Sequence, residues 1–296
     1  RDDIVIVDNL DGQQKFRNLL GTRFHDLIHM DDFYIQLDNG TWDESIIEAI
    51  LHQGACTDTS ECNAKYMMRC NYEASKQLLH FALRQNVRLI YASSASVYGH
   101  VATGPECTTE EQPVSLYGFS KLAFDNYVRR NSKEAPNLIV GLRYFNVYGP
   151  HEDHKGAMAS MVCQLTRQIQ QTGTGVLFSG IGTYGAGEQT RDFIHVRDIV
   201  DVNLYFLKCN PVSSIVNVGS GVESTWNQLA MNVVDALGTG VISYVEFPSH
   251  LTSQYQFKAR ANLSTLRQLG YDKNMTSLRE GVRSYVGLMS RTHSNV

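Results

Sequence analysis

Short apolar runs alternate with longer segments of helical periodicity along most of this 296-residue chain. The runs Ile4–Val7, "AILH", "VRLIY", "LIVGL" and "SIVNV" are continuous rather than alternating, which is typical of parallel strands buried on both faces. They predict strands over residues 4–8, 48–54, 87–94, 138–146 and 214–220. The run "RDFIHV" also has strand character.

Segments in which apolar residues recur at helical spacing lie between and after these strands. This spacing predicts helices over residues 65–86, 115–131, 197–208, 225–238, 262–270 and 277–291. Ser115 is a plausible N-cap of the second helix, and Ser224 or Thr225 of the fourth. The βαβα order predicts an α/β fold: a Rossmann-type, doubly wound parallel sheet with a smaller α/β lobe.

Two interleaved domains are expected. Residues 1–149 with about 190–220 would form the dinucleotide-binding domain, and about 150–189 with 221–296 the substrate-binding domain. The segments between Pro150 and Thr190 and after about Ser220 are less regular. We expect them to form the smaller lobe and to face the carboxyl ends of the strands, where α/β proteins bind ligands.

Asp8 ends the first apolar run, as an acid ends the second strand of a dinucleotide-binding fold and holds the adenosine ribose. We therefore expect the first strand and its glycine-rich loop to lie upstream of Arg1. The string "GIGTYG" is no substitute, because no helix pattern opens at its third glycine. "NVGSGVES" lacks the third glycine and is better interpreted as a turn.

Composition excludes several classes of protein. The net charge of −4 gives no support to nucleic-acid binding, and no apolar run reaches transmembrane length. The six cysteines form no C-x-x-C pair, which favours reduced thiols in a cytoplasmic protein over disulfides or a metal site. The expected partners are a small-molecule substrate and further copies of the chain, not nucleic acid or membrane.

A tyrosine and a lysine mark the candidate chemistry. In "YGFSK", Tyr117 and Lys121 are four residues apart, so they share one face of the helix. A nearby ammonium should favour the phenolate and lower the pKa of Tyr117, which suits proton transfer during alcohol–carbonyl interconversion. "YASS" places Ser93 and Ser94 at the end of the preceding strand, where a hydroxyl can orient a substrate oxygen. Tyr72 and Lys76 have the same spacing but precede that strand, so we interpret them as a packed tyrosine and a solvated lysine.

Longer motifs extend this pattern: "GAC", "KYMM", "NYEASK", "RYFNVYGPHEDHKGAMASM" and "RDFIHVRDIVDVNLYFL". With Ser94, Tyr117 and Lys121 they resemble the extended short-chain dehydrogenase/reductase superfamily, and within it the ADP-glyceromanno-heptose 6-epimerase family. The resemblance runs from "VDNLDG" nearly to the carboxyl end. "HKGAMAS" is its most selective stretch, because general sugar-nucleotide epimerases do not carry it there.

The resemblance implies an isomerase that inverts C6 of an ADP-heptose by transient oxidation to a carbonyl and re-reduction, in lipopolysaccharide core biosynthesis. It implies a tightly bound NADP, with NAD as the alternative, since Lys15 fits a 2′-phosphate whereas Asp8 alone favours NAD. The implied catalytic residues are Ser94, Tyr117, Lys121 and Lys155. The implied cofactor-binding residues are Asp8, Asn9, Lys15, Gln53, Gly54, Ala55, Cys56, Lys121 and Val147.

The resemblance also implies a substrate site formed by Ser94, Asn146, Phe178, Ser179, Gly180, Arg191 and Tyr255. Without it, Arg191 would equally suggest a salt bridge with Asp192. Four positions depart from the family pattern: Ala157 replaces a serine, Cys70 an asparagine, His151 an arginine and Gln164 a histidine.

Two alternatives remain open. One is a related 4-epimerase or 4,6-dehydratase acting on another nucleotide sugar. The other is a non-catalytic chain that binds a nucleotide sugar but no dinucleotide.

Overall fold

The computed structural model describes residues 3–12, 14–43, 47–106, 108–133, 135, 138–210 and 213–293. Its strands are β1 Val5–Asp8, β2 Asp26–His29, β3 Ala49–His52, β4 Arg88–Ser94, β5 Val101–Ala102, β6 Ile139–Tyr144, β7 Asn146–Tyr148, β8 Thr174–Phe178, β9 Thr190–Arg191, β10 Phe193–His195, β11 Ser214–Val218, β12 Ser224–Thr225, β13 Val241–Val245 and β14 Lys258–Ala259.

The α-helices are α1 Met30–Asp38, α2 Ala64–Met68, α3 Ala74–Gln85, α4 Leu116–Asn131, α5 Met161–Thr172, α6 Val196–Lys208, α7 Trp226–Leu237, α8 Ser264–Gln268 and α9 Leu278–His293. Shorter helical turns, labelled η, include η1 Lys15–Leu19, η3 Ala95–Tyr98 and η5 Asp153–Met158.

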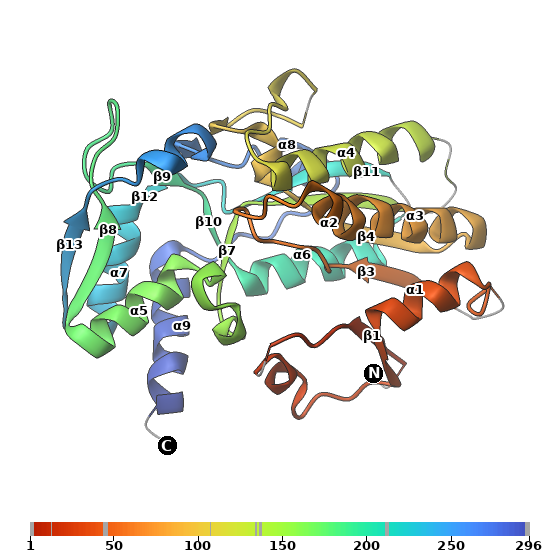
Figure 1. The fold of residues 1–296 in the computed structure, drawn as a ribbon, viewed down its shortest axis with the longest axis horizontal. Helices are drawn as coiled ribbons and strands as arrows, with labels where there is room; N and C mark the ends of the chain where they lie inside the picture. Colours follow the sequence, from red (N-terminus) through yellow and green to blue (C-terminus); the bar gives the residue numbers. More distant parts are fainter. Residues whose placement is uncertain are drawn as a thin grey trace.

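Four parallel strands form the main sheet, in the order β11-β6-β4-β3. Successive residues of a strand point to opposite faces of the sheet, so each strand contributes side chains to two hydrophobic cores. Leu89, Tyr91 and Ile139 pack with α3 and α4 on one face, whereas Ile90, Val140 and Leu142 pack with α6 on the other. Figure 1 shows the sheet between these layers. The predicted α/β fold is confirmed.

The first apolar run forms β1, but it is less buried than its sequence predicted. β1 pairs in parallel with β2 as a separate two-stranded sheet. Ile4, just before β1, and Val7 within it are 48% and 36% exposed. Among the described residues no strand pairs with the other edge of β1. β2 and α1 were not predicted from the sequence.

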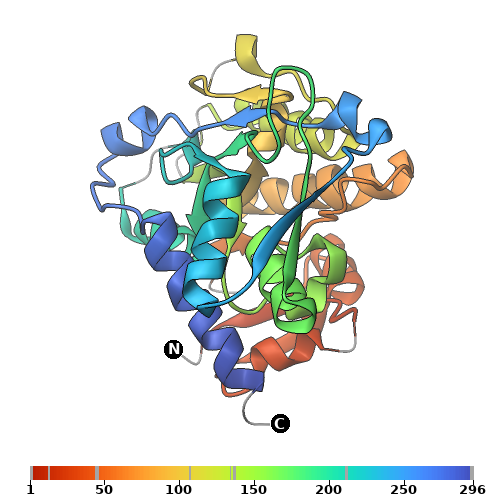
Figure 2. The same ribbon diagram turned by 90° about the vertical axis from the view of Figure 1, so that its left-hand side faces the viewer.

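A smaller lobe lies beside the main sheet, at the left of Figure 1 and facing the viewer in Figure 2. β8 and β13 pair in parallel there, and α5, α7 and α9 bury a separate apolar core. The prediction of an irregular segment between Pro150 and Thr190 was wrong for residues 161–178, which form α5 and β8. The proposed domain boundaries stay a prediction.

The helix predicted over residues 65–86 is broken into three parts. α2 is followed by a π-helical turn, η2 Arg69–Glu73, before α3 begins. Asn71 lies inside the turn and is buried. Other boundaries are closer to prediction: Ser115 caps α4 and Thr225 caps α7, as expected. β3 ends at His52, two residues before the predicted Gly54.

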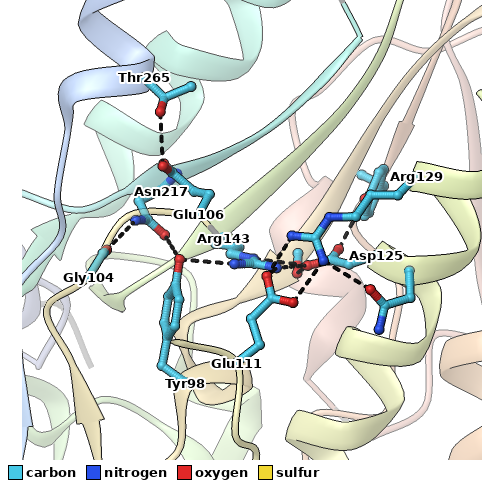
Figure 3. Close-up of polar contacts among 12 residues, drawn as sticks. Tyr98, Gly104, Glu106, Glu111, Asp125, Arg129, Arg143, Asn217 and Thr265 are labelled. Atoms are coloured by element: carbon cyan, nitrogen blue, oxygen red, sulfur yellow. Dashed lines mark hydrogen bonds and ion pairs between the residues drawn. The ribbon is translucent and has the colours of Figure 1, made fainter. Parts of the chain in front are cut away.

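A buried ionic network joins the strands to α4 (Figure 3). Asp125 of α4 accepts hydrogen bonds from Tyr91 Oη, Ser93 Oγ, and both Nε and Nη2 of Arg143, at 2.8–3.0 Å. Arg143 is 0% exposed and also contacts Glu111, which pairs with Arg129. One carboxylate therefore fastens β4 and β6 to the same helix.

The network continues to β11. The Tyr98 hydroxyl accepts a hydrogen bond from Arg143 Nη1 and donates one to Asn217 Oδ1. The Asn217 backbone N–H donates to Glu106, which also accepts from Thr265 (Figure 3). The carboxyl ends of three neighbouring strands are thereby held in register.

No helix among the described residues is long and apolar enough to cross a membrane. Cys56, Cys62, Cys70, Cys163 and Cys209 are free thiols, as expected, and Cys107 lies outside the described residues.

We predict that Arg143→Met lowers the free energy of unfolding by about 3–5 kcal/mol, because it leaves Asp125 and Glu111 buried without their cation. Urea unfolding measures the loss. The control is Arg84→Met, which removes an exposed pair with Asp43 and should cost no more than about 1 kcal/mol. Equal losses in the two variants would contradict this account of the network.

Candidate active site

Ser94, Tyr117 and Lys121 meet above the end of β4. Ser94 is the last residue of β4, and its Oγ accepts the backbone N–H of Ser96 and so caps η3. α4 begins at Leu116, one residue after its cap, so Tyr117 lies in its first turn and Lys121 one turn later. A side-chain hydrogen bond joins Ser94 to Tyr117.

Burial decides the pKa of Tyr117. Removal from water raises this pKa, and the hydrogen bond with Ser94 opposes the rise. The expectation that Lys121 lowers the pKa of Tyr117 is not met in the protein alone. The Lys121 ammonium lies 5.9 Å from the centroid of the phenol ring.

Lys121 is a buried amine, and no carboxylate of the described residues contacts it directly. It is 5% exposed, and its Nζ donates to the backbone carbonyl of Ala92 at 2.9 Å. Burial lowers its pKa to about 8, although the charge of Asp125, one turn further along α4, opposes this shift. An ammonium has three N–H donors and one has a protein acceptor among the described residues, so the others can bind hydroxyl groups of a ligand.

The second tyrosine–lysine pair lies elsewhere. Lys76 bonds to Glu73 at 2.9 Å and lies 4.8 Å above the ring of Tyr72 and 5.3 Å above that of Tyr127. Lys76 thus has an acidic partner and aromatic neighbours, and among the described residues no serine at the end of a strand is recorded in contact with it. This geometry fits the packed tyrosine and solvated lysine expected from the sequence.

Lys155 lies on an exposed loop that follows β7. The loop contains η5, and Gly156 adopts a left-handed φ of 54° within it. Asn146 and Val147 of β7 line a cavity of about 60 Å³ together with Ser160 and Trp226. The structure thus places three of the predicted residues on β7 and the loop that directly follows it.

Arg191 is enclosed by aromatic rings. Its guanidinium carbon lies 5.4 Å from the ring centroid of Trp226 and 4.8 Å from that of Tyr255, and Nη1 donates to the Thr190 carbonyl. It is 5% exposed, and burial lowers its pKa. Among the described residues no carboxylate pairs with it, which leaves a buried cation suited to an anionic ligand.

The alternative of a salt bridge with Asp192 was wrong. Asp192 instead accepts hydrogen bonds from the backbone N–H groups of Ser220, Gly221 and Ala261 and from the Ser220 hydroxyl. These four donors satisfy the carboxylate, so it holds the turn after β11 rather than Arg191.

Phe178, a predicted substrate residue, is linked to Tyr255 through a third aromatic ring. Phe178 at the end of β8 contacts Phe247, which contacts Tyr255 at a centroid distance of 4.9 Å. Ser179 and Gly180 follow Phe178. A Cβ on Gly180 would lie 2.5 Å from the Tyr184 carbonyl oxygen, so the "GIGTYG" string is a tight turn and no helix begins at its end.

The predicted adenosine-binding residues form one polar group at the end of β1. Lys15 Nζ lies 2.7 Å from Asp8 Oδ1 and 3.4 Å from Asn9 Oδ1, and Asp8 also accepts the backbone N–H of Leu10. The group combines a carboxylate for ribose hydroxyls with a cation for phosphate, and both side chains are partly exposed.

Residues Gln53 to Cys56 follow β3, and hydrogen bonds from two groups of side chains fix this segment. Gln53 contacts Asn203 of α6 and Tyr144 of β6. Asn71 bonds to the backbone N–H and carbonyl of Cys56, and its Nδ2 also donates to Ser120 next to Lys121. Asn71 and Asp125 were not predicted from the sequence, because both lie in helical segments whose residue spacing gives no sign of a polar role.

Comparison with known proteins gives a consistent result. Residues 2–219 match the family model described as "NAD dependent epimerase/dehydratase family". The chain is 43% identical over 288 residues to the ADP-L-glycero-D-manno-heptose-6-epimerase of Alkalilimnicola ehrlichii, covering 97% of this chain and 89% of that protein.

Solved structures agree. The ADP-L-glycero-D-manno-heptose-6-epimerase of Helicobacter pylori has a TM-score of 0.82 at 30% identity, covering 97% of this chain and 87% of that one. UDP-glucose 4-epimerase of Thermotoga maritima, solved with UDP-glucose, has a TM-score of 0.80 at 25% identity, covering 98% and 91%.

We predict that Lys121 titrates near pH 8, against about 10.4 for a free lysine. NMR of protein labelled at lysine Cε measures the midpoint, and Lys121→Met identifies the signal by its loss. Asp125→Asn should lower the midpoint further, because the carboxylate favours the ammonium. A wild-type midpoint near 10.4 would contradict the assignment.

Proposed function

The chain belongs to the NAD dependent epimerase/dehydratase family, and we propose that it is an isomerase that inverts C6 of an ADP-heptose. The product would be ADP-L-glycero-β-D-manno-heptose for the lipopolysaccharide core. The 43% identity to a protein named for this activity, over nearly all of both chains, supports the choice of substrate. We also propose that the protein is cytoplasmic and forms a homo-oligomer.

One observation carries the reaction type. The Ser94–Tyr117 hydrogen bond lies beside a buried Lys121 whose pKa is lowered to about 8. A phenol and a serine hydroxyl that share one hydrogen bond can exchange a proton with a sugar hydroxyl placed between them. Such a pair serves interconversion of an alcohol and a carbonyl.

The residues present fit a nicotinamide dinucleotide. Lys121 has N–H donors left for ribose hydroxyls, and the Asp8–Asn9–Lys15 group is partly exposed at a strand end. Gln53, Gly54, Ala55, Cys56 and Val147 would border the same ligand. When bound, the nicotinamide would take the hydrogen and electron pair from the sugar carbon and return them to it.

This chain's residues supply binding and proton transfer. The positive charge of an oxidised nicotinamide would offset the burial of Tyr117 and favour its phenolate. Tyr117 would then remove the proton of the sugar hydroxyl as the carbonyl forms, and Ser94 would hold the sugar oxygen. Lys155 gives a proton to that oxygen when the sugar carbonyl is presented with its opposite face. Two proton-transfer groups suit an epimerase, because the two faces of one carbon must be served in turn.

Arg191 would bind the substrate diphosphate. A buried guanidinium without a carboxylate partner is electrostatically incomplete, and two phosphate groups supply the missing charge. Phe178, Ser179, Gly180 and Tyr255 would line the pocket around it, and Asn146 would contact the sugar.

We propose NADP as the cofactor. Lys15 lies against Asp8 at the ribose end of the site and can pair with a 2′-phosphate. The Asp8 carboxylate alone would favour NAD.

The experiment that tests the function is conversion of ADP-D-glycero-D-manno-heptose, supplied with NADP, to its C6 epimer, followed by proton NMR of the heptose. UDP-galactose and UDP-glucose are the comparison substrates. Conversion of a UDP-hexose with no conversion of ADP-heptose would favour the related 4-epimerase. No conversion together with no uptake of NADP or NAD would favour the non-catalytic alternative.

We predict that Tyr117→Phe lowers turnover by about 10²–10⁴-fold, the usual contribution of a general acid–base group, while the affinity for substrate changes little. Tyr72→Phe is the matched control, because it removes a hydroxyl from the other tyrosine–lysine pair. Wild-type turnover in Tyr117→Phe, or equal losses in the two variants, would refute the assignment.

A further inference from the structure

The Lys155 side chain is not held by contacts of its own. It is exposed, and among the described residues its amine has no hydrogen bond or ion pair. Its backbone N–H donates to the Glu152 carbonyl at 3.0 Å, which starts the turn. The position of the amine therefore depends on how firmly the loop backbone is fixed.

Glu152 joins the two ends of that loop. It is 6% exposed, and its two carboxylate oxygens bind one residue on the far side of the loop. Oε2 accepts the Ser160 backbone N–H at 2.7 Å, and Oε1 accepts the Ser160 hydroxyl at 2.6 Å. The Glu152–Ser160 clasp encloses residues 153–159, with Lys155 among them.

The clasp is anchored to the small lobe. Ser160 is the N-cap of α5, and its Oγ accepts the backbone N–H of Cys163. Ser160 also lines the 60 Å³ cavity that Asn146 and Trp226 border. The Glu152–Ser160 clasp therefore fixes the position of the loop relative to the cavity and to the β7 residues that line it.

Gln164, in the next turn of α5, reinforces the far side of the loop. Its Nε2 donates to the carbonyls of Ala157 and Ala159, at 3.0 and 2.7 Å. On the near side, Asn18 of η1 donates to the His151 carbonyl at 3.1 Å. Glu152 differs from these side chains in being buried and charged and in bonding with both of its oxygens.

We propose that Glu152 is a positioning residue: by clasping Ser160 it holds the loop so that the Lys155 amine reaches the substrate. This inference rests on the role of Lys155 in the proposed function. Glu152 touches neither substrate nor cofactor in it.

The test compares Glu152→Gln with wild type by two measurements. The side-chain amide keeps the shape of the carboxylate but replaces one acceptor by a donor, so one of the two Ser160 donors loses its partner. We expect kcat for ADP-heptose to fall about tenfold or more, with KM nearly unchanged, because the loss concerns placement of a reacting group. We also expect trypsin to cut after Lys155 several-fold faster, as detected by mass spectrometry without substrate or cofactor.

Two further variants complete the test. Glu280→Gln is the matched control: Glu280 accepts a hydrogen bond from Ser277 at the exposed start of α9, and its loss should change neither measurement. Ser160→Ala removes the hydroxyl half of the clasp and should give a smaller change of the same kind. If Glu152→Gln does not fold, Ser160→Ala decides the question.

Unchanged cleavage after Lys155 in the clasp variants would overturn the proposal, and so would faster cleavage with unchanged kcat. Unaltered ADP-heptose with wild-type protein would instead overturn the proposed function. The tryptic rates would then decide by themselves whether Glu152 holds the loop.

Discussion

Much of the structure depends on a single buried carboxylate. Asp125 accepts hydrogen bonds from two side chains of β4 and from the guanidinium of Arg143 on β6. It lies on α4 one turn after Lys121 and fastens the end of β4, where Ser94 lies, to the helix that carries Tyr117 and Lys121. Burying an ion pair brings little net stability, but it penalises every arrangement in which the partners separate. The relative placement of the three residues is therefore specified by charge and geometry together.

The site as a whole combines groups from two cores. The end of β4 and α4 carry Ser94, Tyr117 and Lys121, whereas Trp226 of α7 and Tyr255 supply the aromatic rings around Arg191. Lys155 lies on a loop held by Glu152 and Gln164. Its amine is exposed, whereas Lys121 is buried and donates a hydrogen bond to the Ala92 carbonyl. The two lysines thus have opposite environments, as the two different roles proposed for them require.

The sequence predicted the main strands, the caps at Ser115 and Thr225, and the tyrosine–lysine face of α4, because each depends on local spacing. It missed α5 although Val162, Leu165 and Ile169 lie at helical intervals there, since glycines and polar residues around them obscured the period. The pairing of β8 with β13 and the contacts of Arg143 join residues distant in the chain, which no local pattern encodes. The alternative of an Arg191–Asp192 salt bridge was wrong because four N–H and O–H donors already satisfy Asp192.

The enclosure of Arg191 has an optical consequence. The chain contains two tryptophans, and Trp226 forms one wall of this enclosure while its indole N–H donates to the Tyr255 hydroxyl. The other, Trp42, packs against Phe33 near α1, far along the chain from this pocket. An anion that draws the guanidinium toward itself changes the electric field at one indole and leaves the other as an internal reference. If Arg191 binds the diphosphate as proposed above, the intrinsic fluorescence of the chain would report that binding.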